Sequence, residues 1–354
     1  MTSALVILGS VAGALASFWI VCVVRGSAFR LGLVDEPNAR SSHVRPTPRG
    51  GGIGIIGGAW IGLLIALKDV RDPSVWTVLL CATFVSLVGL ADDVWSLSPG
   101  FRLAAQTTAA AVVVASTGHL QSLPLPAPLS CPVDPPVLGQ ILSVLWIVAV
   151  TNFYNFMDGI DGLAGGQAIA SCVGVALAGW SAGAVGLSAV VGAASLGFVF
   201  HNWAPARIFM GDVGSGFLGF VIASLPFLAP PSLRSDALLA VGIGLSLFIL
   251  DPLETLWRRA QAGKRLTQSH REHRYQELVG PGEPVGWTSA SLVAAGLALS
   301  LLGAAFFRKL ELGWVALAAA LAAFLVERVA GSRRARRRRE SAEAAQEVPS
   351  SKGA

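Results

Sequence analysis

Charged residues are scarce in this chain of 354 residues: Asp, Glu, Lys and Arg together make up 13% of it, whereas hydrophobic residues make up 53%. Soluble globular domains carry about 25% charged residues. The mean hydropathy of +0.64 points in the same direction. This composition excludes an ordinary soluble domain and predicts an integral membrane protein.

Cysteine is also scarce, with four residues in the chain. Cys22, Cys81 and Cys172 lie within apolar runs, and only Cys131 falls in a polar, proline-rich segment. No disulfide framework follows from this distribution. No group of Cys and His residues has the spacing of a zinc site either.

Long apolar runs, by contrast, are abundant. Because a helix needs about 20 mostly apolar residues to cross a bilayer, the sequence predicts an all-α integral membrane protein with about eleven transmembrane helices. The predicted ranges are 3–23, 51–67, 75–90, 103–119, 137–155, 164–180, 183–200, 215–230, 235–253, 285–306 and 311–329. The first run has no positive residue before its apolar core and is followed by Arg25 and Arg30, which favours a retained helix over a cleaved secretory signal.

The positions of Lys and Arg orient these helices, because short cytoplasmic loops collect positive charge. With the N-terminus outside, 21 of the 26 basic residues fall on the cytoplasmic side, and the C-terminus is also cytoplasmic. The net charge of +5 then reflects topology and requires no nucleic-acid partner. We expect residues 1–330 to form the membrane domain, and residues 331–354, with "RRARRRRE", to be a disordered basic cytoplasmic tail near anionic lipid.

The unusual polar clusters are concentrated in five segments that this topology places in the cytoplasm. They are "VDEPNARSSHVRPTPRGGG" (34–52), "GLADDVWSLSPGFRLAAQ" (89–106), "NFYNFMDGIDGLAGG" (152–166), "HNWAPARIFMGDVGSG" (201–216) and "RRAQAGKRLTQSHREHRYQ" (258–276). The outer loops carry no comparable grouping. We therefore expect the functional site at the cytoplasmic face.

Five carboxylates in these segments point to a bound cation. Asp92 and Asp93 are adjacent, Asp158 and Asp161 are one helical turn apart, and Asp212 lies in "FMGDVGS". One such carboxylate alone is more often a solvated helix cap, but five on one face resist joint ionisation unless a cation lies among them. Carboxylate and amide oxygens suit a hard ion, so we expect Mg²⁺ shared with a phosphorylated substrate, with Mn²⁺ as a substitute.

Basic side chains share this face in a mixture suited to clamping a pyrophosphate. Arg49 and Arg102 are among them, and "SHREHRY" at 269–275 places two imidazoles and two guanidiniums in one short segment. Taken singly, each Arg is more often an ordinary cytoplasmic-loop residue, and each His a satisfied polar contact. The compactness of the 269–275 segment favours an anion site.

Six motifs in order give the chain its resemblance to a known family. They are "DEPNARSSHVRPTPRGGG", "LADD", "SPGFRLAAQ", "NFYNFMDGIDGLAGG", "ARIFMGDVGSGFLG" and "SHREHRYQ". Across nearly its whole length the chain resembles the polyprenyl-phosphate N-acetylhexosamine-1-phosphate transferases, which include the phospho-N-acetylmuramoyl-pentapeptide transferases. The resemblance implies transfer of a sugar 1-phosphate from a UDP-sugar to polyprenyl phosphate, with release of UMP.

The resemblance also implies residue roles. Asp212 would be the main Mg²⁺ ligand and Asn155 a second one, while Asp92 and Asp93 would orient or deprotonate the polyprenyl phosphate. Phe209 would stack on the uracil. The remaining roles are nucleoside binding for Asp158, Asp161 and Asn152, sugar-phosphate binding for His270, Arg271 and His273, and phosphate binding for Arg49 and Arg102. Asp251 matches the family only loosely, so a milder effect is expected for Asp251→Asn. Direct attack of the polyprenyl phosphate on the UDP-sugar is favoured over a covalent aspartyl-phosphate intermediate, although the sequence is compatible with both mechanisms.

The last polar segment, "SHREHRYQELV", is similar to that of the branch that initiates O-antigen and exopolysaccharide synthesis. This likeness favours a UDP-N-acetylhexosamine as donor, with GlcNAc, FucNAc, QuiNAc and GalNAc all open, and undecaprenyl phosphate as acceptor in a bacterial inner membrane. Dimerisation is left open. The alternative function is a multi-span transporter or flippase of lipid-linked sugars, against which the nearly charge-free span centres argue.

Overall fold

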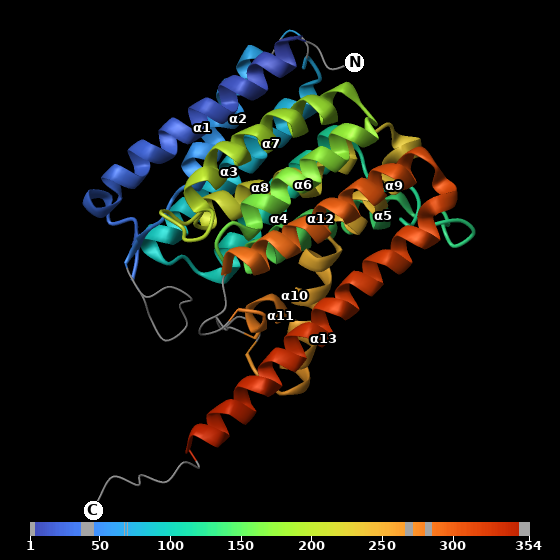
Figure 1. The fold of residues 1–354 in the computed structure, drawn as a ribbon. Coiled ribbons are helices and arrows are strands. Elements are labelled where there is room, and N and C mark those ends of the chain that lie inside the picture. The colour runs from blue at the N-terminus through green and yellow to red at the C-terminus, as the bar shows by residue number, and fades with distance from the viewer. Residues whose placement is uncertain are drawn as a thin grey trace, which may run out of the picture.

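The computed structural model describes residues 4–346 except 37–45, 67, 69, 266–271 and 280–284. This part of the chain is almost entirely helical, as predicted, and Figure 1 shows the helices gathered into a bundle. The α-helices are α1 Ala4–Leu31, α2 Gly52–Ile65, α3 Pro73–Trp95, α4 Pro99–Thr117, α5 Pro136–Phe156, α6 Leu163–Ala178, α7 Ala182–Asn202, α8 Asp212–Ser224, α9 Arg234–Gly244, α10 Ser246–Gln261, α11 Arg274–Glu277, α12 Val285–Arg308 and α13 Gly313–Gln346. Two short strands, β1 Val34–Asp35 and β2 Thr47–Pro48, pair antiparallel.

Each of the eleven predicted ranges overlaps at least one helix, but fewer than eleven of the described helices are long enough to cross a membrane. Six helices are long and apolar enough to cross a membrane, namely α1, α3, α5, α7, α12 and the Gly313–Arg334 part of α13. The pair Asp212–Leu228 and Pro231–Gly244, bent by 117°, would make a seventh if counted as one span. Helices α2 and α6 are apolar but shorter. The multi-pass, all-helical architecture is therefore established, whereas eleven spans and the orientation of the termini stay predictions.

The predicted span 235–253 is divided in the structure. Helix α9 ends at Gly244, and α10 begins at Ser246 and continues to Gln261. Helix α10 leaves the main bundle and lies with α11 beside α13 (Figure 1). A hydropathy average cannot register this break, because both helices contribute apolar residues to the same window.

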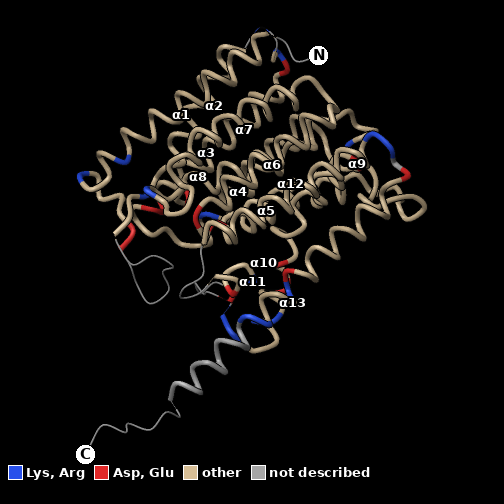
Figure 2. The backbone as a smooth tube through the Cα atoms, viewed as in Figure 1, with Lys and Arg blue, Asp and Glu red and all other residues tan. Residues whose placement is uncertain are grey.

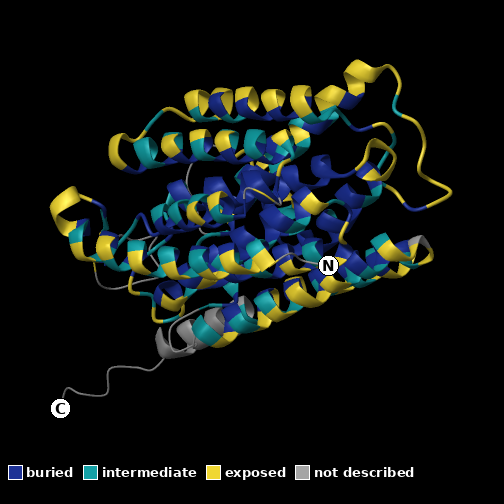
Figure 3. Cartoon of the chain, turned by 90° about the horizontal axis from the view of Figure 1, so that it is seen from above, coloured by how far each residue is buried: buried dark blue, intermediate teal, exposed yellow. Residues whose placement is uncertain are grey.

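Glycine allows the helices on one side of the bundle to approach closely. A Cβ atom placed on Gly58 of α2 would lie 2.4 Å from the carbonyl oxygen of Gly13 in α1, and one on Gly197 of α7 would lie 2.2 Å from the oxygen of Ala14. Small residues at such crossings are typical of helix packing in membranes. Figure 3 shows the buried residues in the middle of the bundle and the exposed ones on its outer helices.

The turn between α3 and α4 is short and fixed by local signals. Helix α3 ends at Trp95, after which Ser96 adopts a left-handed conformation with φ of 51°. Helix α4 then begins at Pro99, with the Ser98 hydroxyl accepting from the backbone N–H of Phe101. Serine before proline at a first helical turn is a common start signal. The turn brings Asp92 of α3 close to the first turn of α4.

The last helix extends into the basic tail. Helix α13 continues without a break to Gln346 and so includes residues 331–346, whose disorder stays a prediction. The run is rich in Arg, Ala and Glu, which are strong helix formers. This helix also carries the chain past the predicted domain boundary at residue 330.

Figure 2 shows that charged residues are sparse along the middles of the bundle helices, and two of the places where they gather concern the site. One is the end of the bundle where α3, α4 and α8 meet. The other is the group formed by α10, α11 and the adjoining part of α13. These two charged regions contain the predicted site residues that the structure describes.

Candidate active site

The start of α8 is held against the start of α2 by backbone contacts. Gly51 N–H donates to the carbonyl oxygen of Phe209 over 2.9 Å, and Gly52 N–H donates to that of Met210 over 3.0 Å. A Cβ atom on Gly52 would lie 2.2 Å from Cα of Gly214, so no larger residue fits there without a shift. This contact sets Asp212, the first residue of α8, at the charged end of the bundle.

Asp212 lies at the centre of a group contributed by four helices, which we call the Asp212 centre: Asp92, Arg102, Asn155 and Asp212. Arg102 Nη1 donates to Asp212 Oδ2 over 3.0 Å and also bonds Asp92 Oδ2. Asn155 Nδ2 donates to Asp212 Oδ1 over 2.9 Å. The Asp212 side chain is nevertheless 34% exposed, so a ligand can reach it.

Asp93 has different partners from its neighbour Asp92. It is buried and faces Arg49, whose Nη1 lies 3.6 Å from Asp93 Oδ1. The backbone N–H of Val213 also donates to Asp93. Gly211, with φ of 74°, leaves room for this carboxylate, because a Cβ atom there would lie 2.7 Å from Asp93 Oδ2. The two adjacent carboxylates, given one shared role from the sequence, thus occupy distinct environments.

The turn between α5 and α6 carries Asp158 and Asp161. Asp161 Oδ2 accepts from the backbone N–H of Ala206 over 2.8 Å. Burial, with the carboxylates of Asp212, Asp93 and Asp161 nearby, raises the pKa of Asp158 to about 7. Negative charge is therefore crowded at this end of the bundle.

Asn202 holds this turn and was missed in the sequence. Its Oδ1 accepts from Gly162 N–H over 3.0 Å, and its Nδ2 donates to the carbonyl oxygen of Ile208 over 3.0 Å. Gly162 has φ of 78°, which an L side chain rarely adopts. The motif "HNW" at the end of an apolar run was the available signal, but an Asn at a helix end does not by itself indicate a functional role.

Asn152 and Phe209 lie at the edges of the site. Asn152 Nδ2 donates to Gln106 Oε1 of α4 over 2.6 Å, so Asn152 contacts α4 whereas Asn155 contacts α8. Phe209 is half-buried, and its backbone N–H donates to the carbonyl oxygen of Pro48 over 2.8 Å. Gln106 is a second residue that the sequence did not single out.

Of the predicted His-Arg group, His270 and Arg271 lie outside the described residues, whereas His273 is 4% exposed. Its Nδ1 lies 3.2 Å from Asp251 Oδ1. His273 precedes α11, and Tyr275 of α11 donates its hydroxyl to the carbonyl oxygen of Phe156 over 2.9 Å. This bond ties α11 to the end of α5, next to the Asp158 turn.

Asp251 connects the elements of this second region through its hydrogen bonds. It is fully buried and accepts from the backbone N–H groups of Arg274 and Tyr275 over 3.1 and 3.0 Å, and from the Thr255 hydroxyl over 3.1 Å. The carboxylate thereby caps the start of α11 from another helix. From the sequence, only a mild effect was expected for Asp251→Asn. The interactions of Asp251 in the structure indicate that it holds α11 in place.

Two larger cavities adjoin the site. One, of about 580 Å³, is lined by Asp161, Trp203 and Trp287. The other, of about 600 Å³, is an apolar groove between α4 and α5 that begins at Leu103, next to Arg102, and includes Val148, one turn before Asn152. This α4–α5 groove is lined mainly by apolar side chains, and its first lining residue follows Arg102 directly in the chain.

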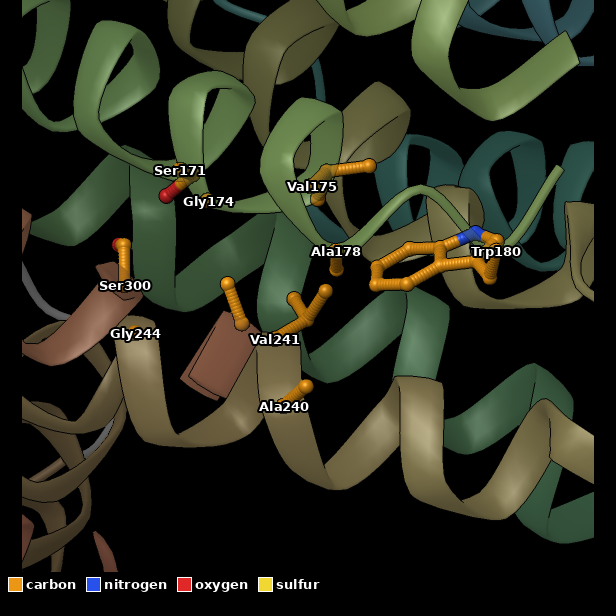
Figure 4. A pocket seen from close by; sticks show the side chains of 10 residues that line it. Ser171, Gly174, Val175, Ala178, Trp180, Ala240, Val241, Gly244 and Ser300 are labelled. Atoms are coloured by element: carbon orange, nitrogen blue, oxygen red, sulfur yellow. The ribbon is translucent and has the colours of Figure 1, made fainter. Parts of the chain in front are cut away.

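A third cavity, shown in Figure 4, lies among α6, α9 and α12. It measures about 10 Å³ and is lined by Ser171, Trp180, Ser300 and small residues. A volume of that size fits about one water molecule. It is too small for a substrate.

The donor set at the Asp212 centre fits a metal ion that is shared with a substrate. Among the residues that the structure describes, no group of three or more His, Cys, Asp or Glu side chains could hold a metal by itself. Mg²⁺ typically uses one or two carboxylates and completes its shell with water and phosphate oxygens. Accessible Asp212 meets that requirement. Asn155 turns its N–H toward Asp212 and supports it, and only a rotated amide would offer an oxygen ligand.

The fold and the site define a multi-pass membrane protein that gathers carboxylates and guanidiniums at one end of a helix bundle. Residues 75–229 match the model of glycosyl transferase family 4. The chain is 32% identical over 270 residues to a probable undecaprenyl-phosphate N-acetylglucosaminyl 1-phosphate transferase of Bacillus subtilis strain 168, covering 74% of each chain. The chain therefore belongs to glycosyl transferase family 4.

Other relatives show the same kinship. The decaprenyl-phosphate N-acetylglucosaminephosphotransferase of Mycolicibacterium smegmatis is 34% identical over 294 residues, which cover 73% of this chain and 71% of the relative. A phospho-N-acetylmuramoyl-pentapeptide-transferase of Synechococcus elongatus is 28% identical over 326 residues, covering 83% of this chain and 84% of the relative. The resemblance proposed from the sequence motifs is confirmed.

Proposed function

We propose that this protein transfers an N-acetylhexosamine 1-phosphate from a UDP-sugar to undecaprenyl phosphate at the cytoplasmic face of a bacterial inner membrane. The single observation that carries the proposal is that Arg102, which bonds Asp212, is followed in α4 by Leu103, the first residue that lines the apolar α4–α5 groove. A polyprenyl chain suits such a groove, and its phosphate would then lie beside Arg102. The names of the relatives support the same reaction.

The reaction proposed is a direct displacement at phosphorus. An oxygen of the polyprenyl phosphate attacks the phosphorus that carries the sugar, the bond from this phosphorus to the bridging oxygen of UDP breaks, and UMP leaves with that oxygen. The product is a lipid-linked pyrophosphoryl sugar. A phosphate monoester needs little activation once its repulsion from the donor is offset.

The residues of the Asp212 centre would perform the electrostatic part of this task. Arg102 already bridges two carboxylates and would offset charge on the incoming phosphate. Asp212, oriented by Asn155, would hold Mg²⁺, which would offset the negative charge of the phosphate oxygens. Asp93, buried beside Arg49, would keep that guanidinium in place. We also propose that the product initiates a cell-surface glycan.

The donor would lie on the other side of the centre. Asp161 borders the cavity of about 580 Å³ with Trp203 and Trp287, which offers space for a nucleoside or sugar ring beside a carboxylate. We propose that the nucleoside part of the UDP-sugar binds near Asp161 and Phe209. The hexosamine identity is not specified by these residues.

The test uses the full-length protein in lipid nanodiscs with a panel of UDP-N-acetylhexosamines. UMP release should require undecaprenyl phosphate and a divalent cation, and Asp212→Asn should abolish it. A flippase would release no UMP under any of these conditions. Absence of release with every donor, or release that is independent of the lipid phosphate, would overturn the proposal.

A further inference from the structure

Helix α11 is short, yet it is held at both ends by other elements. At its start, Asp251 of α10 accepts the backbone N–H groups of Arg274 and Tyr275. On one side, the Tyr275 hydroxyl bonds the end of α5. An isolated helix of this length is unstable in water, so its position depends on these contacts.

The far end of α11 is held by α13. Arg334 Nη1 donates to the carbonyl oxygen of Leu278 over 2.7 Å, and Leu278 is the residue that ends α11. The two segments are also packed closely at Gly331, where a Cβ atom would lie 3.4 Å from the carbonyl oxygen of Arg274. A guanidinium at a helix C-terminus satisfies a free carbonyl and interacts favourably with the helix dipole.

One turn before Gly331, α13 places a second group against this region. Glu327 is 5% exposed, and neither of its carboxylate oxygens has a hydrogen-bond partner among the described residues. Farther from the bundle, Arg333 is exposed. The face of α13 toward α11 is thus buried, whereas its opposite face is exposed.

We propose that Arg334 is a positioning residue that, through Leu278, holds α11 and the preceding His273 against the end of α5. The inference rests on the proposed function in that the held segment packs against the end of α5, next to the Asp158 turn beside which the donor would bind. Helix α13, which lies beyond the family match at residues 75–229, is then part of the site's architecture as well as a membrane element.

The test compares Arg334→Ala, the charge-preserving Arg334→Lys and the matched control Arg333→Ala in the full-length protein in nanodiscs. Loss of this hydrogen bond should raise the KM for UDP-N-acetylglucosamine about fivefold in Arg334→Ala. The KM for undecaprenyl phosphate should stay within about twofold. Arg334→Lys should recover part of the loss, because an ammonium group can still donate to Leu278, and Arg333→Ala should match the unaltered protein.

Hydrogen exchange separates this inference from the proposed function. Amides 273–279 should exchange about five times faster in Arg334→Ala, while those of α6 stay unchanged. Equal exchange in Arg334→Ala and the unaltered protein would overturn the inference, as would the same effects in Arg333→Ala. If the unaltered protein released no UMP from any donor, the proposed function would fail, and the exchange comparison would still decide the role of Arg334.

Discussion

The two charged regions of this protein use the same residue types for different ends. At the Asp212 centre, the Asp212 side chain is 34% exposed and shares one guanidinium with Asp92. In the α10–α11 region, Asp251 is fully buried and accepts hydrogen bonds from four groups. An accessible carboxylate with few partners can bind a ligand, whereas a buried and saturated one fixes the fold. The charge of a side chain does not by itself locate an active site. The accessibility of the side chain and the number of its hydrogen-bond partners distinguish the two cases.

The largest effect should come from Asp212→Asn. The variant keeps the shape of the side chain and the bond to Asn155 but removes the charge. We expect turnover to fall by at least about 100-fold at saturating Mg²⁺, with unchanged yield and thermal stability. UMP release and a melting curve measure the two quantities. Near-normal turnover would contradict the role of Asp212 as a metal ligand.

Asp251→Ala should fail in a different way. It leaves buried donors without an acceptor, at a cost of about 1–3 kcal/mol for each group left unsatisfied. We therefore expect a lower melting temperature together with weaker UDP-sugar binding. Asp251→Asn should be milder, because Oδ1 still accepts. If Asp251→Ala had a normal melting temperature but lost turnover to the same extent as Asp212→Asn, the two regions would not differ in function as described.

Asn155→Ala and Asp161→Ala should impair different steps of the reaction. Asn155 orients Asp212, so its loss should mainly lower turnover and raise the Mg²⁺ requirement. Asp161 borders the donor cavity, so its loss should mainly raise the KM for the UDP-sugar. Titrations of metal and of donor distinguish the two. Identical metal dependence in both variants would contradict this division.

The smallest effect should come from Arg328→Ala. Arg328 Nε lies 3.3 Å from Glu254 Oε1, but the Arg328 side chain is 52% exposed. Exposed ion pairs contribute about 0–1 kcal/mol. Activity and stability should therefore stay within about twofold of the unaltered protein. A large loss would show that α13 acts through its charges and not through the single bond from Arg334.

The sequence predicted the helices, and it singled out the residues of the Asp212 centre from short polar motifs, whose roles stay predictions. Apolar runs mark the helices, and Asp92, Arg102, Asn155 and Asp212 lie in recognisable motifs that the fold brings together. The break at Leu245 was not visible, because apolar residues continue through it.

Partners distant in the chain were harder to predict. Gln106, Asn202 and Asp251 act through hydrogen bonds to residues far from them in sequence or to backbone groups, and no pattern specifies such partners. His273 was assigned to the donor, yet its Nδ1 faces Asp251 in a buried setting. That role for His273 stays a prediction, now with positioning by Asp251 as its structural basis.

We expect the Asp212 centre to bind a divalent cation and the Asp251 region to bind none. Electron paramagnetic resonance of Mn²⁺, added to the full-length protein with UDP-N-acetylglucosamine, measures this most directly. We expect a bound Mn²⁺ signal that Asp212→Asn abolishes and Asp251→Asn retains. Binding that persists in Asp212→Asn, or that is lost equally in both variants, would contradict this expectation.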